Sequence, residues 1–174
     1  MHLDTLAGLQ AEYEAAFHLT FLLVEWLGRE EATELSPRER DFLRLLTPIV
    51  KLTTGRQSVV VLSEIVESFG GAGYVEDTGI PVLLRDAQVF SIWEGTTNVL
   101  ALDALRTLHA GTALDQLTIE VETALSSVRD TQLLSAANTA RIAMSRALEW
   151  LKQAAGPELE AGARRFALTL GRSL

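Results

Sequence analysis

Glu94 is the residue of this sequence best placed for acid–base chemistry, and it lies between Trp93 and Gly95 in the segment WEGTTN. Residues 96–98 are of types that cap helices, and apolar residues at helical spacing follow them. Glu94 should therefore precede a helix N-terminus, where free backbone amides favour an anion or a developing oxyanion. A carboxylate shielded from water beside an indole ring would serve as a general base. The alternative is that Glu94 caps the helix or faces solvent.

Gly70, Gly71 and Gly73 form a second unusual feature. They lack the G-x-G-x-x-G spacing of dinucleotide-binding loops, and a helical pattern rather than a strand precedes them. Glycines at this position allow left-handed conformations at the end of a helix and the close approach of a backbone or a flat ligand. A tight turn between two helices is the simpler interpretation. Farther along, structural ion pairing is expected for Arg85 and Asp86.

Other kinds of site find little support in the sequence. The chain has no Cys and only three, widely spaced histidines, which excludes thiolate chemistry and argues against a metal site. The lack of Cys is typical of a reducing compartment, so we expect a cytoplasmic protein. No segment has the roughly 18 consecutive apolar residues of a membrane-spanning helix, and none has the pattern of a signal peptide.

The composition predicts a folded domain. With 174 residues, of which 48% are hydrophobic, the chain can bury a sizeable core. The formal net charge of −8 argues against a polyanion-binding surface that covers the whole protein. The charge is unevenly distributed, because residues 141–174 carry six basic and three acidic side chains. Only this C-terminal segment is mildly basic.

Apolar residues at three- and four-residue spacing predict an all-α fold. The first helix should end at Gly28. The second should begin at Pro37, with Ser36 as its N-cap, and continue to about Phe69. Pro48 must either kink the second helix or start a new segment, because proline lacks the amide proton. Further helices are expected after Pro81, after residues 96–98, within 111–130 and 131–155, and over 157–174.

The segment 67–106 resembles the C-terminal helical domain of acyl-CoA dehydrogenases. It reads ESFGGAGYVEDTGIPVLLRDAQVFSIWEGTTNVLALDALR, and the family pattern is Q-x-x-G-G-x-G-Y, then P-x-x-x-x-x-R-D-A, then x-Y-E-G-T. In this chain, three residues rather than five separate Pro81 from Arg85. With the upstream segments AEYEAA and PIVKL included, the resemblance covers about 110 residues. It is nearest to the AidB-like branch, the alkylation-response flavoproteins, because Trp93 replaces the common Tyr and Glu67 replaces the common Gln.

The resemblance implies an FAD-dependent oxidoreductase that acts on acyl-CoA. Glu94 matches the catalytic base of the family, which removes the α proton of the acyl thioester while hydride leaves the β carbon for the flavin. Thr96 and Asn98 match positions that contact FAD in relatives. Elementary chemistry agrees with the role of Glu94, since a general base works best in a dry site against a substrate with a polarised carbonyl.

The glycine turn also has a counterpart in the family. Gly70, Gly71 and Gly73 match a turn that approaches the FAD of a neighbouring subunit in family tetramers, which implies a homo-oligomer, either a dimer or a tetramer. Glu67 departs from the family pattern, because its charge would repel a pyrophosphate that the family glutamine contacts. That one contact is therefore not expected here.

The resemblance also implies how the chain is organised. Residues 1–110 would form part of an up-and-down helical bundle of the C-terminal domain type, and residues 111–174 would form a helical extension packed on it. The N-terminal helical and middle β domains of the family have no counterpart in this sequence. We therefore expect the isolated chain to be unable to complete the reaction. The flavin ring would have no protein surface on its opposite side, and the acyl-CoA would have no binding channel.

Two classes of function remain open at this point. In the first, the chain is the C-terminal part of an acyl-CoA dehydrogenase; in the second, it is a catalytically silent helical module for interaction or oligomerisation. The extension of AidB-like proteins is associated with DNA binding, but solvated surface is the simpler interpretation here, because nonspecific DNA affinity needs several neutralised phosphates. The basic candidates are Arg141, Arg146, Lys152, Arg164, Arg165 and Arg172.

Overall fold

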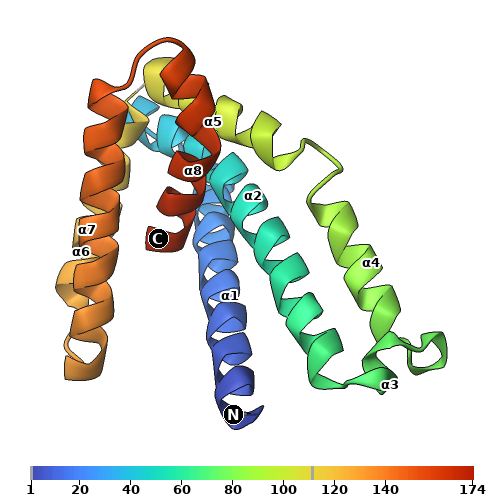
Figure 1. Cartoon of the computed structure of the whole chain (residues 1–174). Helices are drawn as coiled ribbons and strands as arrows, with labels where there is room; N and C mark the ends of the chain where they lie inside the picture. Colours follow the sequence, from blue (N-terminus) through green and yellow to red (C-terminus); the bar gives the residue numbers. More distant parts are fainter. Residues whose placement is uncertain (1, 111) are drawn as a thin grey trace.

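The computed structural model describes residues 2–110 and 112–174, and every element in these ranges is helical, which confirms the all-α prediction (Figure 1). In chain order the elements are α1 (His2–Ala32), α2 (Pro37–Ser68), α3 (Gly71–Tyr74), the 3-10 turn η1 (Glu76–Thr78), α4 (Ile80–Phe90), α5 (Thr97–Ala110), α6 (Ala113–Ser127), α7 (Thr131–Gln153) and α8 (Pro157–Ser173). The expected boundary between two regions falls at Gly111, outside the described residues. In the described ranges, no helix combines the length and apolar character needed to cross a membrane.

The helix α2 organises the fold, because α1, α4, α5, α6 and α8 all contact it. Its buried residues lie between Phe42 and Gly55, and among them Phe42 and Ile49 belong to the core. Trp26 of α1 packs edge-on against Phe42, with 5.1 Å between the ring centroids. Leu117 of α6 and Leu170 of α8 join the same apolar cluster. Burial of these side chains supplies the main stabilisation of the fold.

The N-terminus of α2 is fixed by a capping box, which confirms the prediction that Ser36 is the N-cap. The Ser36 amide donates to the Glu39 carboxylate at 2.8 Å, and the Glu39 amide donates to the Ser36 hydroxyl at 3.4 Å. These bonds hold the pKa of Glu39 below its usual value. Pro48 lies within one continuous helix from Pro37 to Ser68, so the alternative of a new segment at this proline is wrong.

The helix α1 continues past Gly28 to Ala32, so the predicted end at Gly28 is also wrong. The last turn is stabilised from within the helix. Arg29 pairs with Glu25 one turn earlier, and its guanidinium lies 4.6 Å from the centroid of the Trp26 ring. Because Gly28 retains helical backbone geometry there, its lower helix propensity is outweighed by these contacts.

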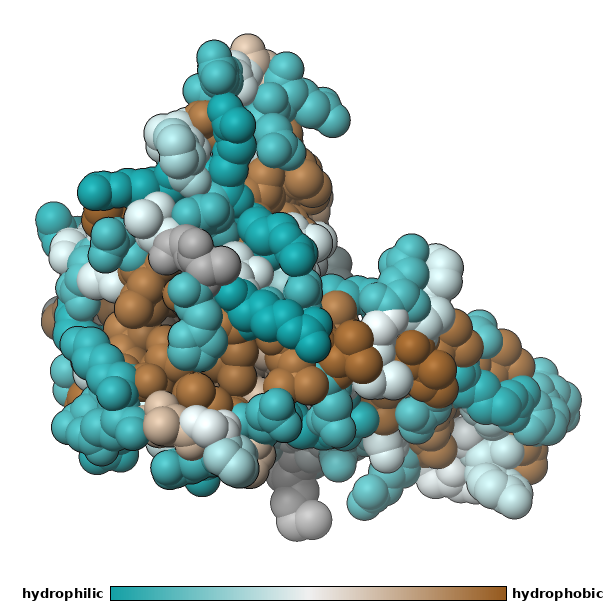
Figure 2. Space-filling view, turned by 90° about the horizontal axis from the view of Figure 1, so that it is seen from above, coloured by the Kyte–Doolittle hydropathy of each residue, from teal (hydrophilic) through white to brown (hydrophobic). Residues whose placement is uncertain are grey.

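The remaining helices form two projections from the central core (Figure 1). In one, α4 runs beside the second half of α2 and α3 lies at the far end; in the other, α6 and α7 lie together and α8 returns against α5, α7 and α2. Figure 2 shows apolar side chains exposed among polar ones, both on the main body and on the projection where Figure 1 places α4. The large exposed apolar residues of α4 are Val82, Leu83, Val89 and Phe90.

Candidate active site

The turn that carries Glu94 is attached to α2 by a lysine. The Lys51 ammonium donates to the carbonyl oxygens of Phe90, at 2.6 Å, and of Trp93, at 3.1 Å. It therefore holds both the end of α4 and the residue directly before Glu94. Bonds from a charged donor are among the stronger hydrogen bonds in proteins, so the position of this turn is well determined.

A second contact to α2 lies one turn beyond Lys51. The Ser91 hydroxyl donates to the carbonyl oxygen of Gly55 at 2.8 Å. A Cβ atom on Gly55 would lie 3.1 Å from the Phe90 carbonyl oxygen, so a glycine lets α4 approach α2 closely. Lys51 and Gly55 face the same turn because they are four residues apart in a helix.

Glu94 is exposed and adopts φ +58°, the one positive φ of a non-glycine residue in the described ranges. Such a conformation is uncommon outside glycine and persists where the surroundings enforce it. With Lys51, Thr54 and Trp93 among its neighbours, Glu94 lines an open cavity of about 430 Å³. Trp93 is itself 53% exposed, so the described residues do not shield the carboxylate from water.

The glycine turn lies towards the other end of α4, whose 11 residues span about 16 Å at 1.5 Å per residue (Figure 1). Gly70 has φ +56° and ψ −136°, a backbone conformation that glycine adopts far more readily than other residues. A Cβ on Gly73 would lie 2.0 Å from the Val66 carbonyl oxygen, so packing within the chain requires this glycine. A Cβ on Gly71 would meet nothing within 4 Å. The turn interpretation thus explains Gly70 and Gly73, and Gly71 leaves a stretch of backbone bare.

Thr96 and Asn98 lie beside Glu94, at the start of α5. Thr96 is exposed, and its carbonyl oxygen accepts the Leu100 amide at 3.0 Å as the first bond of the helix. Asn98 contacts the C-terminal segment, because its side-chain oxygen accepts a bond from the Arg164 guanidinium at 3.1 Å. No sequence pattern predicts this bond, which joins residues on α5 and α8.

Arg85 pairs with Glu76 rather than with its neighbour Asp86. Both guanidinium donors lie 2.8 Å from the two carboxylate oxygens, a bidentate arrangement. The pair holds the pKa of Glu76 below its usual value and raises the pKa of Arg85. It braces η1 against α4, so a structural role for Arg85 is in keeping with the geometry. Within the described ranges, no three His, Asp or Glu side chains are grouped to hold a metal ion.

Comparison with known proteins shows which sequences resemble this chain. Residues 3–109 match the sequence profile of the acyl-CoA dehydrogenase C-terminal domain. Over 106 residues the chain is 52% identical to acyl-CoA dehydrogenase family member 11 of Caenorhabditis elegans, covering 61% of this chain and 17% of that protein. Over 109 residues it is 36% identical to the putative acyl-CoA dehydrogenase AidB of Escherichia coli, covering 62% and 19%. The matched segment thus spans less than a fifth of the length of these relatives.

Solved structures extend the likeness to nearly the whole chain. The crystal structure of Caenorhabditis elegans ACDH-11 in complex with C11-CoA superposes with a TM-score of 0.82 at 38% identity, covering 98% of this chain and 30% of that one. The apo-form of Bd2924 superposes with a TM-score of 0.79 at 42% identity, covering 98% and 31%. The helices beyond residue 109 therefore share their arrangement with these proteins. Residues 3–109 match the C-terminal domain of the acyl-CoA dehydrogenase family, and the chain belongs to this family.

Proposed function

We propose that this chain provides the catalytic-base side of an FAD-dependent acyl-CoA dehydrogenase, with Glu94 as the base. The observation that carries the proposal is the Glu94 turn: an uncommon backbone conformation, held to α2 by Lys51, which presents a carboxylate to a cavity of about 430 Å³. The segment that contains it belongs to the matched family domain. A carboxylate in this setting can accept a proton from carbon once a substrate excludes water around it.

In the proposed reaction, the Glu94 carboxylate takes the α proton of an acyl-CoA thioester as the α,β double bond forms. FAD, when bound, supplies the acceptor for the hydride that leaves the β carbon. Thr96 is exposed beside Glu94, and the bare backbone at Gly71 offers a surface that a flat group can approach, so both fit contacts with a flavin. Gly71 lies at the far end of α4, which agrees with a contact to the flavin of a second copy.

The cavity at Glu94 is open, and its described lining contributes one side of a site. We therefore propose that catalysis requires additional protein surface, outside residues 2–174, to enclose the substrate and the flavin. The isolated chain is then expected to be inactive. An acyl-CoA ligand is supported by the structural likeness to ACDH-11, which was solved in complex with C11-CoA. A cytoplasmic location stays a proposal that rests on the absence of Cys.

A chimera tests the proposal. In ACDH-11, the segment that superposes on this chain is replaced by residues 2–174, and the purified protein is assayed for flavin absorbance and for acyl-CoA oxidation with an artificial electron acceptor. We expect a yellow, active enzyme, while the isolated chain is colourless and inactive. A folded chimera, judged by circular dichroism and gel filtration, that lacks turnover would contradict the proposal.

We also propose that the branch assignment is broader than AidB, because relatives at 52% and 36% identity carry both names. We further propose that residues 1–110 form the helical bundle and that residues 111–174 form the extension packed on it.

Binding of DNA by the extension has little support, because few of its basic side chains are free to contact phosphates. Three of the basic candidates, Arg141, Arg164 and Arg172, are already bonded to side chains of other helices.

A second function, assembly into homo-oligomers, is supported by the surface of α1. Tyr13, Phe17 and Phe21 stack along this helix, with 6.3 Å and 4.5 Å between successive ring centroids. They are 60%, 45% and 54% exposed, respectively. Contiguous exposed aromatic side chains are uncommon on a monomer and are typical of interfaces. We propose that this face pairs with another copy of the chain.

Sedimentation velocity is expected to show the wild-type chain as a dimer or tetramer. The double variant Phe17→Glu, Phe21→Glu should sediment as a monomer, because charges on the aromatic face cannot be desolvated without a partner. Ser145→Glu with Ala161→Glu adds the same charge at exposed positions of α7 and α8 and should leave the assembly intact. A monomeric wild-type chain would show that the α1 face is not a self-association surface.

A further inference from the structure

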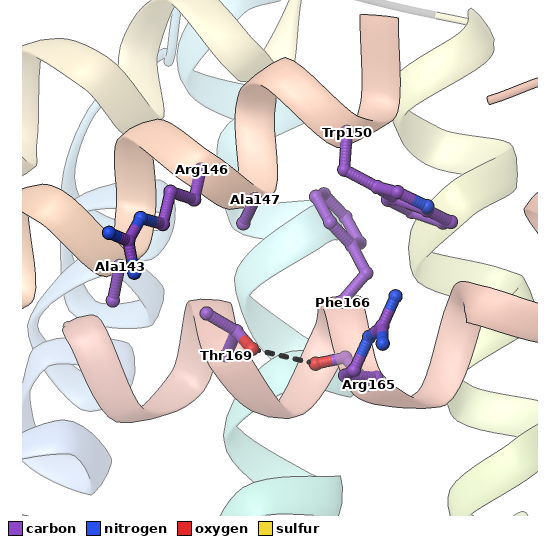
Figure 3. A pocket seen from close by; sticks show the side chains of 7 residues that line it. All are labelled: Ala143, Arg146, Ala147, Trp150, Arg165, Phe166 and Thr169. Atoms are coloured by element: carbon purple, nitrogen blue, oxygen red, sulfur yellow. Dashed lines mark hydrogen bonds between the residues drawn. The ribbon is translucent and has the colours of Figure 1, made fainter. Parts of the chain in front are cut away.

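A cavity of about 330 Å³ opens between α7 and α8, away from the Glu94 turn (Figure 3). This volume is at the lower end of the range for small-molecule sites. Its lining is largely apolar with two basic residues, and no acidic residue is among the described residues that form it. The lining consists of Ala143, Arg146, Ala147, Trp150, Arg165, Phe166 and Thr169.

The aromatic side of this cavity is preformed. The Trp150 and Phe166 rings lie with their centroids 5.5 Å apart and their planes inclined by 36°. A Cβ on Gly162 would lie 2.1 Å from the Trp150 ring, so the indole is seated directly on the backbone of α8. Phe166 is buried, at 3% exposure, and Ala147 lies opposite it on α7 (Figure 3). A ligand would meet a fixed apolar surface at little cost in side-chain ordering.

The two arginines of the cavity come from different helices. In Figure 3, Arg146 of α7 lies beside Ala143, and Arg165 of α8 extends towards Trp150. Both side chains are exposed, and neither has an ion pair or side-chain hydrogen bond to another described residue. Thr169 bonds to the Arg165 carbonyl oxygen, not to its guanidinium. The cavity is therefore locally positive on a chain whose net charge is −8.

We propose that this cavity binds a small organic carboxylate, with its apolar ring or chain against Trp150 and Phe166, its carboxylate at Arg165 beside Trp150, and Arg146 adding positive charge at the other end of the cavity. Guanidinium groups match the geometry of a carboxylate, and the aromatic rings bury the rest of the ligand. A nucleic acid is less well suited, because two free guanidinium groups neutralise few phosphates. The site is separate from Glu94 and does not depend on the proposed catalysis.

Fluorine NMR of the full chain labelled with fluorotryptophan tests the site, because the three tryptophans give three resonances. Trp93→Phe and Trp150→Phe variants assign them. Naphthoate should shift the Trp150 resonance saturably, with a dissociation constant on the order of 1 mM or tighter. Naphthamide, which has the same ring system and no charge, should bind at least about tenfold more weakly if the guanidinium groups contribute as exposed charge pairs do.

Variants of Arg146 and Arg165 test whether their guanidinium groups cause the preference for naphthoate over naphthamide. Arg146→Gln with Arg165→Gln should weaken naphthoate binding about tenfold and leave naphthamide binding unchanged. Arg38→Gln with Arg106→Gln removes two exposed arginines elsewhere and should leave both ligands unaffected. Equal binding of naphthoate and naphthamide would overturn the proposal, as would naphthoate binding that survives the Arg146 and Arg165 changes. Displacement of naphthoate by a low concentration of oligonucleotide would overturn it in favour of a nucleic-acid surface.

Discussion

Replacing Glu94 by Gln in the ACDH-11 chimera is expected to lower turnover by about 10²–10⁴-fold, the usual contribution of a positioned general base. Gln has the shape of Glu and can occupy the same turn, but its amide cannot accept the α proton. The loss should appear equally in kcat and kcat/KM, because proton transfer is made only in the transition state. Flavin absorbance and acyl-CoA binding should persist, which separates the chemical role of Glu94 from a structural one.

Glu64→Gln is the matched control. Glu64 is an exposed glutamate of α2 whose carboxylate makes no bond to another described residue, so the same change of charge there should leave turnover within about twofold, as for surface substitutions in general. The assignment of Glu94 as the base fails if the Glu94→Gln chimera keeps its turnover. It also fails if flavin is lost together with activity, because Glu94 would then be holding the turn or the cofactor.

The sequence was sufficient for the parts of the fold that depend on neighbouring residues. Apolar periodicity identified the helices, and Ser36 with Pro37 located the start of α2. The prediction from sequence was wrong at Gly28, where the helix continues because Arg29 contacts Glu25 and Trp26. These contacts join residues within one turn, but their contribution is decided by side-chain geometry, which propensity does not describe.

The candidate site was likewise predictable only where it depends on neighbouring residues. Capping residue types placed Glu94 ahead of α5, and this position is correct. The Lys51 bonds and the Ser91 bond to Gly55 join residues 36 to 42 positions apart, so no local pattern predicts them. A glycine inside a long helix was the available signal for Gly55, since such glycines often mark close helix packing.

Gly171→Ala is expected to destabilise the chain by about 2–3 kcal/mol, even though alanine is the better helix former. A Cβ at this position would lie 1.9 Å from the Thr53 hydroxyl oxygen and 2.9 Å from the Thr53 Cβ. Thr53 is 2% exposed on the central helix, and rotation of its hydroxyl would leave the 2.9 Å contact with its Cβ in place. The clash would separate α8 from α2, and the melting temperature should fall by about 5–10 °C.

Gly8→Ala provides the control, because a Cβ on this exposed glycine of α1 would meet nothing within 4 Å. It should stabilise the chain by about 0.5–1 kcal/mol through helix propensity alone. Adding Thr53→Ala to Gly171→Ala removes the nearest atom and should restore part of the loss, giving a coupling of at least about 1 kcal/mol in a double-mutant cycle. The Thr53 hydroxyl has no hydrogen-bond partner among the described residues, so its removal sacrifices no bond. Strict additivity of the two changes would show that α8 does not rest on α2 through this contact.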